Sequence, residues 1–204
     1  MKDLIWKAWL QSTRPIQTLR QVGQKWQTVC AGAEGSQIAE LAVSLPLIVV
    51  MLVGIMDFGQ AFNLKHKLET ATREAARFAS NQSSADLTNP VPPSINAVRD
   101  VIHNYLQATQ IDDCGLAAAL PSNADLVWTY KTTANCPGTL TVVIDRGTTY
   151  QTPGGTPVTV EATHITISYP FQWHFNRVVK LVMPSASYAQ SVQINVDAMI
   201  QNLD

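Results

Sequence analysis

Residues 41–56 read LAVSLPLIVVMLVGIM, a stretch of 16 residues without a charged side chain. Counted from Ser36, a helix through this stretch has 21 residues. Its length of about 31 Å matches a hydrocarbon core of roughly 30 Å. We therefore predict a transmembrane helix over residues 36–56. A buried helix in a soluble core is the alternative, and the length and low polarity argue against it. Pro46 removes one backbone hydrogen bond, so a kink or loosened turn is expected there.

The charges ahead of this stretch predict its direction. Residues 1–35 form a basic leader in which two acidic residues, Asp3 and Glu34, oppose five basic ones: Lys2, Lys7, Arg14, Arg20 and Lys25. An excess of Lys and Arg favours the cytoplasmic side of a membrane. We therefore expect a single-pass protein with a cytoplasmic N-terminus and with everything after Asp57 outside.

The junction between leader and apolar run indicates a cleavage site. A glycine, Gly35, is followed five positions later by Glu40, at the edge of the apolar helix. A carboxylate at that depth costs a few kcal/mol unless it has a partner. Cleavage after Gly35 supplies one, because the new α-amine of Ser36 is cationic near neutral pH. Glu40 can then pair within its own helix or with the amine of a neighbouring subunit. The alternative is that Glu40 reaches the membrane surface and Gly35 is a loop residue.

Beyond Asp57 the apolar pattern becomes periodic. Residues 57–80 contain no proline, and their apolar positions follow a 3-4-3-4-3 spacing that predicts an amphipathic extension of the same helix. We expect its seam to pack on the chain's own sheet, or else on the helix of a neighbouring subunit. The seam consists of Ala61, Leu64, Leu68, Ala71, Ala75 and Phe78.

These features together resemble the TadE-like family, pseudopilins of the tight-adherence (Flp pilus) machinery. The resemblance rests on residues 35–40, Leu45-Pro46, residues 57–62 and residues 71–79, and is looser at residues 166–171. It implies cleavage by a prepilin peptidase between Gly35 and Ser36, in the bacterial inner membrane with a periplasmic C-terminal domain. The implied partners are other pilins or pseudopilins and the platform proteins of pilus assembly. Family members often have a tyrosine where this chain has Leu41.

The remaining residues, 81–204, predict an outer α+β domain. A proline-rich break at 81–93 precedes an amphipathic helix from Ser94. Strands are expected at 125–131, 139–145, 158–169 and 191–200, with a hairpin turn at 152–157. Residues 172–183 fit either a short helix or an apolar loop against the membrane. The fold class is therefore α+β, with a long N-terminal helix packed on a small, mostly antiparallel sheet, as in pilins.

The cysteines fit an oxidising compartment. Cys30 precedes the membrane stretch, whereas Cys114 and Cys136 follow it and would form an isolated pair outside. A bridge would close a loop of about 20 residues and stabilise the domain by roughly 3 kcal/mol. Two free thiols are the alternative.

The sequence predicts no enzyme, cofactor or metal site. Its net charge of −1 gives no indication of nucleic-acid binding. The four histidines are scattered, and the motifs of hydrolases, nucleotide-binding proteins and zinc sites are missing. Asp112 and Asp113 lack further oxygen ligands at the spacing of a calcium loop. The competing hypotheses are therefore a processed pilin-like subunit, an unprocessed membrane-tethered binding or adhesion module, and, least supported, an envelope hydrolase.

Overall fold

The computed structural model describes residues 33–151, 158–182, 185 and 191–203. Contacts within the chain define two units, Met1–Leu52 and Val53–Asp204, with the boundary inside one helix. The predicted leader up to residue 32 and the predicted turn at 152–157 lie outside the described residues.

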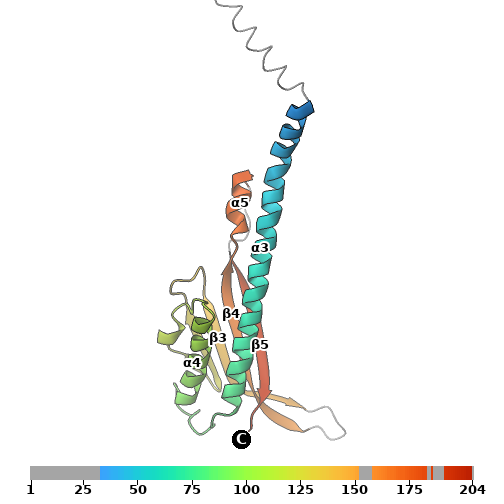
Figure 1. Ribbon diagram of the computed structural model, residues 1–204. Coiled ribbons are helices and arrows are strands. Elements are labelled where there is room, and N and C mark those ends of the chain that lie inside the picture. The colour runs from blue at the N-terminus through green and yellow to red at the C-terminus, as the bar shows by residue number, and fades with distance from the viewer. Residues whose placement is uncertain (1–32, 152–157, 183–184, 186–190, 204) are drawn as a thin grey trace, which may run out of the picture. The chain divides into compact units, whose positions relative to one another are not determined.

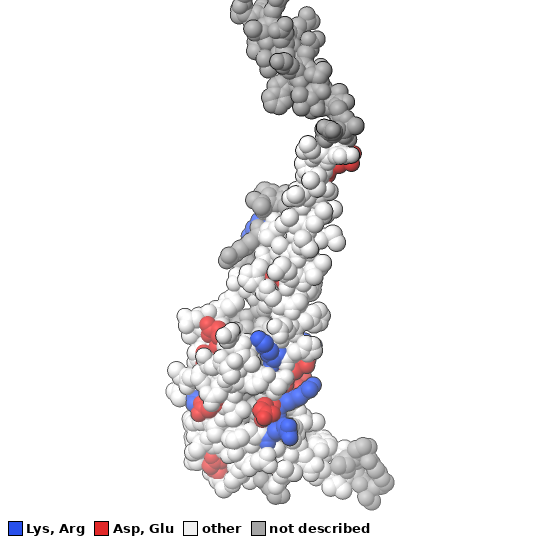
Figure 2. Space-filling model, viewed as in Figure 1, with Lys and Arg blue, Asp and Glu red and all other residues white. Residues whose placement is uncertain are grey.

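Helix α3 (Ala33–Ser80) contains the apolar stretch (Figure 1). Pro46 lies inside α3 and does not end it. The segment Gln37–Ser80 is, by length and composition, able to cross a membrane: its most apolar window has a mean hydropathy of 2.5, and none of that window is buried. In Figure 2 the upper part of this helix is mostly white, and most of the visible blue and red side chains lie on the second unit. In the first unit, large apolar side chains such as Val43 and Leu47 are exposed. This is compatible with a single-pass membrane protein.

The second unit is built on one five-stranded sheet in which every neighbouring pair is antiparallel. The strands are adjacent in chain order: β1 (Ser122–Ala124), β2 (Val127–Thr132), β3 (Leu140–Gln151), β4 (Thr159–Gln172) and β5 (Ser191–Gln201). The register shifts between Asp145 and Thr148, where β3 carries an irregularity opposite β4. Alternate residues of the central strands are buried, as expected for a sheet with one covered face.

Helix α4 (Pro93–Ala108) helps to cover this face, and the short 3₁₀ helix η1 (Leu116–Ala118) follows it. The buried residues of α4 include Ile95, Val98 and Ile102. Opposite them, Tyr130 donates a hydrogen bond of 3.0 Å to Asn96 Oδ1. Burial raises the pKa of this tyrosine to about 12, because the ionised phenolate would lose its hydration.

The outer half of α3 closes the core along β4 and β5 (Figure 1). Its face towards the sheet consists largely of small side chains, and the fully buried positions are Leu68, Ala71, Thr72, Ala75, Ala76 and Ala79. Alanines allow the helix backbone to approach the sheet closely, so that the sheet's larger side chains fill the space between. Ala61 and Leu64 are half-buried.

The predicted seam is wrong at its last position. Phe78 is 36% exposed, and Ala79 occupies the buried position instead. The heptad spacing used for the prediction repeats every 3.5 residues, whereas a straight helix repeats every 3.6. The mismatch turns a heptad seam by about 20° per seven residues, which carries residue 78 away from the sheet.

The C-terminal end of α3 is held by an arginine from the sheet. Arg146 follows Ile144 on the buried face of β3 and is 3% exposed. Its guanidinium donates to the carbonyl of Ala79 and, at 3.0 Å, to that of Gln82. A cation at this end of a helix also meets the negative end of the helix dipole. The backbone N–H of Leu203 donates to the Ser80 carbonyl as well, at 3.2 Å.

The α+β prediction is confirmed, with differences in detail. The sheet has five strands rather than the four expected, because β1 was not predicted. Strand β3 extends to Gln151, six residues beyond the predicted end at 145. The ambiguous segment 172–183 contains a short helix, α5 (Phe175–Val182).

Candidate functional site

The predicted cleavage site lies in the first turns of α3. Gly35 and Ser36 have helical backbone, and Glu40 is exposed one turn further along the helix. Residues four apart lie on the same side of a helix. An α-amine at Ser36 would therefore be within reach of the Glu40 carboxylate.

Asp57, the first charged residue after the apolar stretch, is buried. It is 2% exposed, and one of its carboxylate oxygens accepts a hydrogen bond from the backbone N–H of Phe175. His174 Nδ1 lies 3.5 Å from the other oxygen. Phe175 is the first residue of α5, and the first N–H groups of a helix lack partners within it. Asp57 therefore caps α5 from a different helix, and its negative charge faces the positive end of the α5 dipole.

Three aromatic side chains from the same segments of the chain contact one another. The rings of Phe58 and Trp173 lie 5.2 Å apart, and those of Phe171 and Trp173 lie 5.0 Å apart, both edge to face. Such pairs contribute about 0.5–1.5 kcal/mol beyond the area that they bury. We call Phe58, Phe171 and Trp173 the aromatic cluster. The residue patterns predicted no structural role for this cluster or for the Asp57 carboxylate. The one hint in the sequence is that Asp57 directly follows the apolar stretch, because a carboxylate beside lipid needs a partner.

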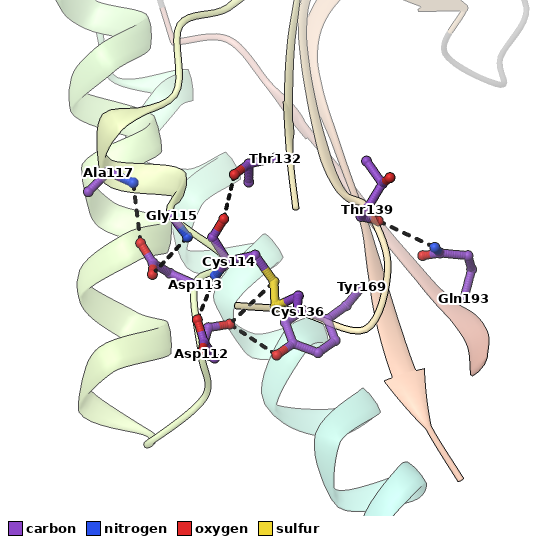
Figure 3. Close-up of a disulfide and its surroundings, with 10 residues drawn as sticks. All are labelled: Asp112, Asp113, Cys114, Gly115, Ala117, Thr132, Cys136, Thr139, Tyr169 and Gln193. Atoms are coloured by element: carbon purple, nitrogen blue, oxygen red, sulfur yellow. Dashed lines mark hydrogen bonds between the residues drawn. A yellow bond between two sulfur atoms is a disulfide. The ribbon is translucent and has the colours of Figure 1, made fainter. Parts of the chain in front are cut away.

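Cys114 and Cys136 form a disulfide, with Cα atoms 5.4 Å apart (Figure 3). The bridge ties the loop after α4 to the loop between β2 and β3. The same loop is held by hydrogen bonds: Thr132 donates to the Cys114 carbonyl, and Tyr169 donates to the Asp112 carbonyl at 3.0 Å. Asp112 and both cysteines bring possible ligand atoms within 4.8 Å of one another. Because the two sulfurs are bonded to each other, they are not available as thiolate ligands.

Asp113 organises the polypeptide beside this disulfide. Its carboxylate accepts from the backbone N–H groups of Ala117 and Gly115, each at 3.2 Å, and lies 2.8 Å from His103 Nδ1. Burial alone would raise the pKa of Asp113, but these hydrogen bonds and the nearby histidine outweigh it and lower the pKa below 3.8. Gly115 has a φ of +79°, and a Cβ there would lie 2.9 Å from that of Ala134. This position therefore requires glycine.

An open depression near the C-terminal end of α3 gives no indication of a particular ligand. Its lining mixes apolar, amide and carboxylate side chains, including Leu87, Asn123 and Glu161. The guanidinium of Arg146 also lines it but donates to the helix carbonyls described above.

Replacing Asp113 should change how stability depends on pH. Because the folded-state pKa is lowered, the ionised carboxylate stabilises the fold above the unfolded pKa of about 3.9, and this contribution is lost as pH falls through the folded pKa. Asp113→Asn should therefore be most destabilising at neutral pH and progressively less so in acid. Urea unfolding of the detergent-solubilised protein at a series of pH values measures this. Asp125→Asn, at an exposed position, is the control and should not alter the pH profile. An Asp113→Asn deficit that is independent of pH would contradict the assignment.

Removing the Asp57 carboxylate should loosen α5. Asp57→Ala removes an acceptor at the start of the helix, and losing such a cap costs about 1 kcal/mol, or about fivefold faster hydrogen exchange across α5. Asp57→Asn keeps one acceptor oxygen and should have a smaller effect. Glu69→Ala, at a surface ion pair on α3, is the control. Exchange in α5 that is equal in all three variants would show that the cap is not important.

Comparison with known families gives one match. A family model described as "TadE-like protein" matches residues 35–77, which run from Gly35 through the apolar stretch into the packed half of α3. Searches of curated proteins and of solved structures found no match. The match agrees with the resemblance seen in the sequence. Over residues 35–77, this chain is similar to TadE-like proteins.

Proposed function

We propose that this chain is a minor pilin-like subunit, a pseudopilin, of a tight-adherence pilus system. In this proposal a prepilin peptidase removes residues 1–35, and the product acts in pilus biogenesis, secretion or adhesion. The observation that carries the proposal is the position of the family match: it begins at Gly35 and covers the exposed apolar helix that follows. The partners are other pilins or pseudopilins and the proteins of the assembly platform.

Cleavage has a physical role in this proposal. The new α-amine of Ser36 has an ordinary pKa of about 7.7–8.0 and is largely cationic at neutral pH. Glu40 lies one helical turn away, at the edge of the apolar stretch. In a low-dielectric environment an amine and a carboxylate attract one another much more strongly than in water. Between staggered helices, the amine of one subunit can meet Glu40 of the next and set their register.

The disulfide supports the proposed orientation. Bridges such as Cys114–Cys136 persist in oxidising compartments, and the basic leader favours the cytoplasm. Both considerations favour a cytoplasmic N-terminus and a periplasmic sheet-bearing unit in the bacterial inner membrane. The alternative function is an unprocessed, membrane-tethered binding or adhesion module, which has the same anchor and orientation. Cleavage after Gly35 distinguishes the two.

Gly35→Ala should block processing. In cells that contain the pilus system, the unsubstituted chain should yield a mature protein beginning at Ser36, whereas Gly35→Ala should retain residues 1–35. Intact-mass measurement and N-terminal sequencing of the membrane-extracted protein read this directly. Gly32→Ala, three residues earlier, is the matched control and should be processed normally. A mature unsubstituted protein that still begins at Met1 would favour the membrane tether and refute the proposed processing.

Glu40→Gln should separate assembly from processing. The substitution keeps size and polarity but removes the charge that attracts the Ser36 amine. We expect normal cleavage but about tenfold less recovery with the other pilins and platform proteins, which corresponds to about 1.4 kcal/mol. Quantitative co-purification after crosslinking measures this recovery. Glu74→Gln, at an exposed position on the same helix, is the control. Equal recovery of both variants would exclude the electrostatic role of Glu40.

A further inference from the structure

One surface of the second unit is not used by the proposed assembly contact. It consists of Phe58 and Phe62 on α3 and Trp173, the residue that follows β4. Phe58 and Phe62 are four residues apart, so they lie on one side of α3, and each is 60% exposed. Trp173 is half-buried against Phe58. We call these three residues the boundary surface; helix α5, which begins next to it, carries the exposed Lys180.

The boundary surface lies where the apolar stretch ends. Residues 41–56 carry no charge, and Asp57 is the next residue. The hydrogen bond from Phe175 to Asp57 fixes the start of α5 at this point of α3. The contact between Phe58 and Trp173 fixes the end of β4 there as well. Phe58 and Phe62 therefore follow the apolar stretch directly in the chain, and α5 begins beside Asp57.

Its chemistry fits the headgroup layer of a phospholipid membrane. Tryptophan concentrates at membrane–water interfaces, where its ring lies among the headgroups and its N–H in water, and phenylalanine occurs on the apolar face of helices that lie in this layer. Helix α5 carries an exposed lysine, Lys180, in its last turn and has no acidic residue in its sequence. Basic side chains near a membrane surface are attracted to anionic lipids by about 1 kcal/mol each.

We propose that α5 and the boundary surface form a second membrane contact, in the phospholipid headgroup layer beside α3. This proposal depends on the membrane anchor that is part of the proposed function. Asp57 is a positioning residue for it, because its carboxylate holds the start of α5 to α3. The contact limits the rotation of the sheet-bearing unit about the membrane normal. A subunit that leaves the bilayer for a fibre must release it.

Lipid-borne quenchers test the contact in the full-length chain. A fluorophore is attached to Lys180→Cys in a Cys30→Ser background, in which the two other cysteines are joined by the disulfide. The chain is reconstituted singly into nanodiscs of phosphatidylcholine and phosphatidylglycerol that carry a nitroxide just below the headgroup. The matched control is Lys131→Cys, also an exposed lysine, on β2. We expect quenching at position 180 to exceed that at 131 by about threefold or more, the order expected for a group at the interface.

Two outcomes would overturn the proposal. One is equal quenching at positions 180 and 131. The other is a fluorescence signal at position 180 that changes with the number of chains per disc and not with the lipid nitroxide. That result would assign the surface to a second copy of the chain. Resistance of the protein to alkaline carbonate extraction is measured in parallel. A chain that is extracted lacks the membrane anchor on which the proposed function depends, whereas an integrated chain with no quenching at 180 refutes the second contact alone.

Discussion

The close approach of α3 to the sheet is the contact on which the other features depend. Small side chains at Ala71, Ala75, Ala76 and Ala79 let the helix backbone lie near the strands, and these four residues are fully buried. Arg146 then reaches the carbonyl of Ala79 at the C-terminal end of the helix. At the other end of the packed segment, Asp57 reaches the first N–H of α5. Larger residues on this face would move the helix outwards and lengthen both hydrogen bonds.

Much of this arrangement could be predicted from residue patterns. An uncharged run of membrane length and a seam of small apolar residues indicate the long helix and the side that it buries. The prediction failed at Phe78 because a heptad pattern drifts on a straight helix. It missed β1, since Ser122–Ala124 is three exposed residues with no alternation to detect. The prediction also missed the extension of β3. Arg146 occupies the next buried position of this strand, but a pattern that looks for alternating apolar residues ends at a charged one.

The candidate site was less predictable because its contacts join distant parts of the chain. Asp57 and Phe175 are 118 residues apart, and no local pattern relates them. The spacing of Gly35 and Glu40, by contrast, depends only on the geometry of one helix and is visible in the sequence. The pairing of Cys114 and Cys136 could be predicted for a different reason: the predicted membrane helix separates Cys30 from them. Local helix geometry and the pairing of the cysteines could be predicted, whereas tertiary hydrogen bonds could not.

The two carboxylates that bracket the apolar stretch have different environments. Asp57 is buried, and its carboxylate is held by the chain's own α5, so that end of the stretch is fixed within the subunit. Glu40 lies on the exposed surface of α3, where a neighbouring subunit can reach it. If both acids were enclosed by their own subunit, neither could direct contacts between subunits. Asp57 serves the fold of its own subunit, whereas a new amine near Glu40, as proposed above, can act between subunits.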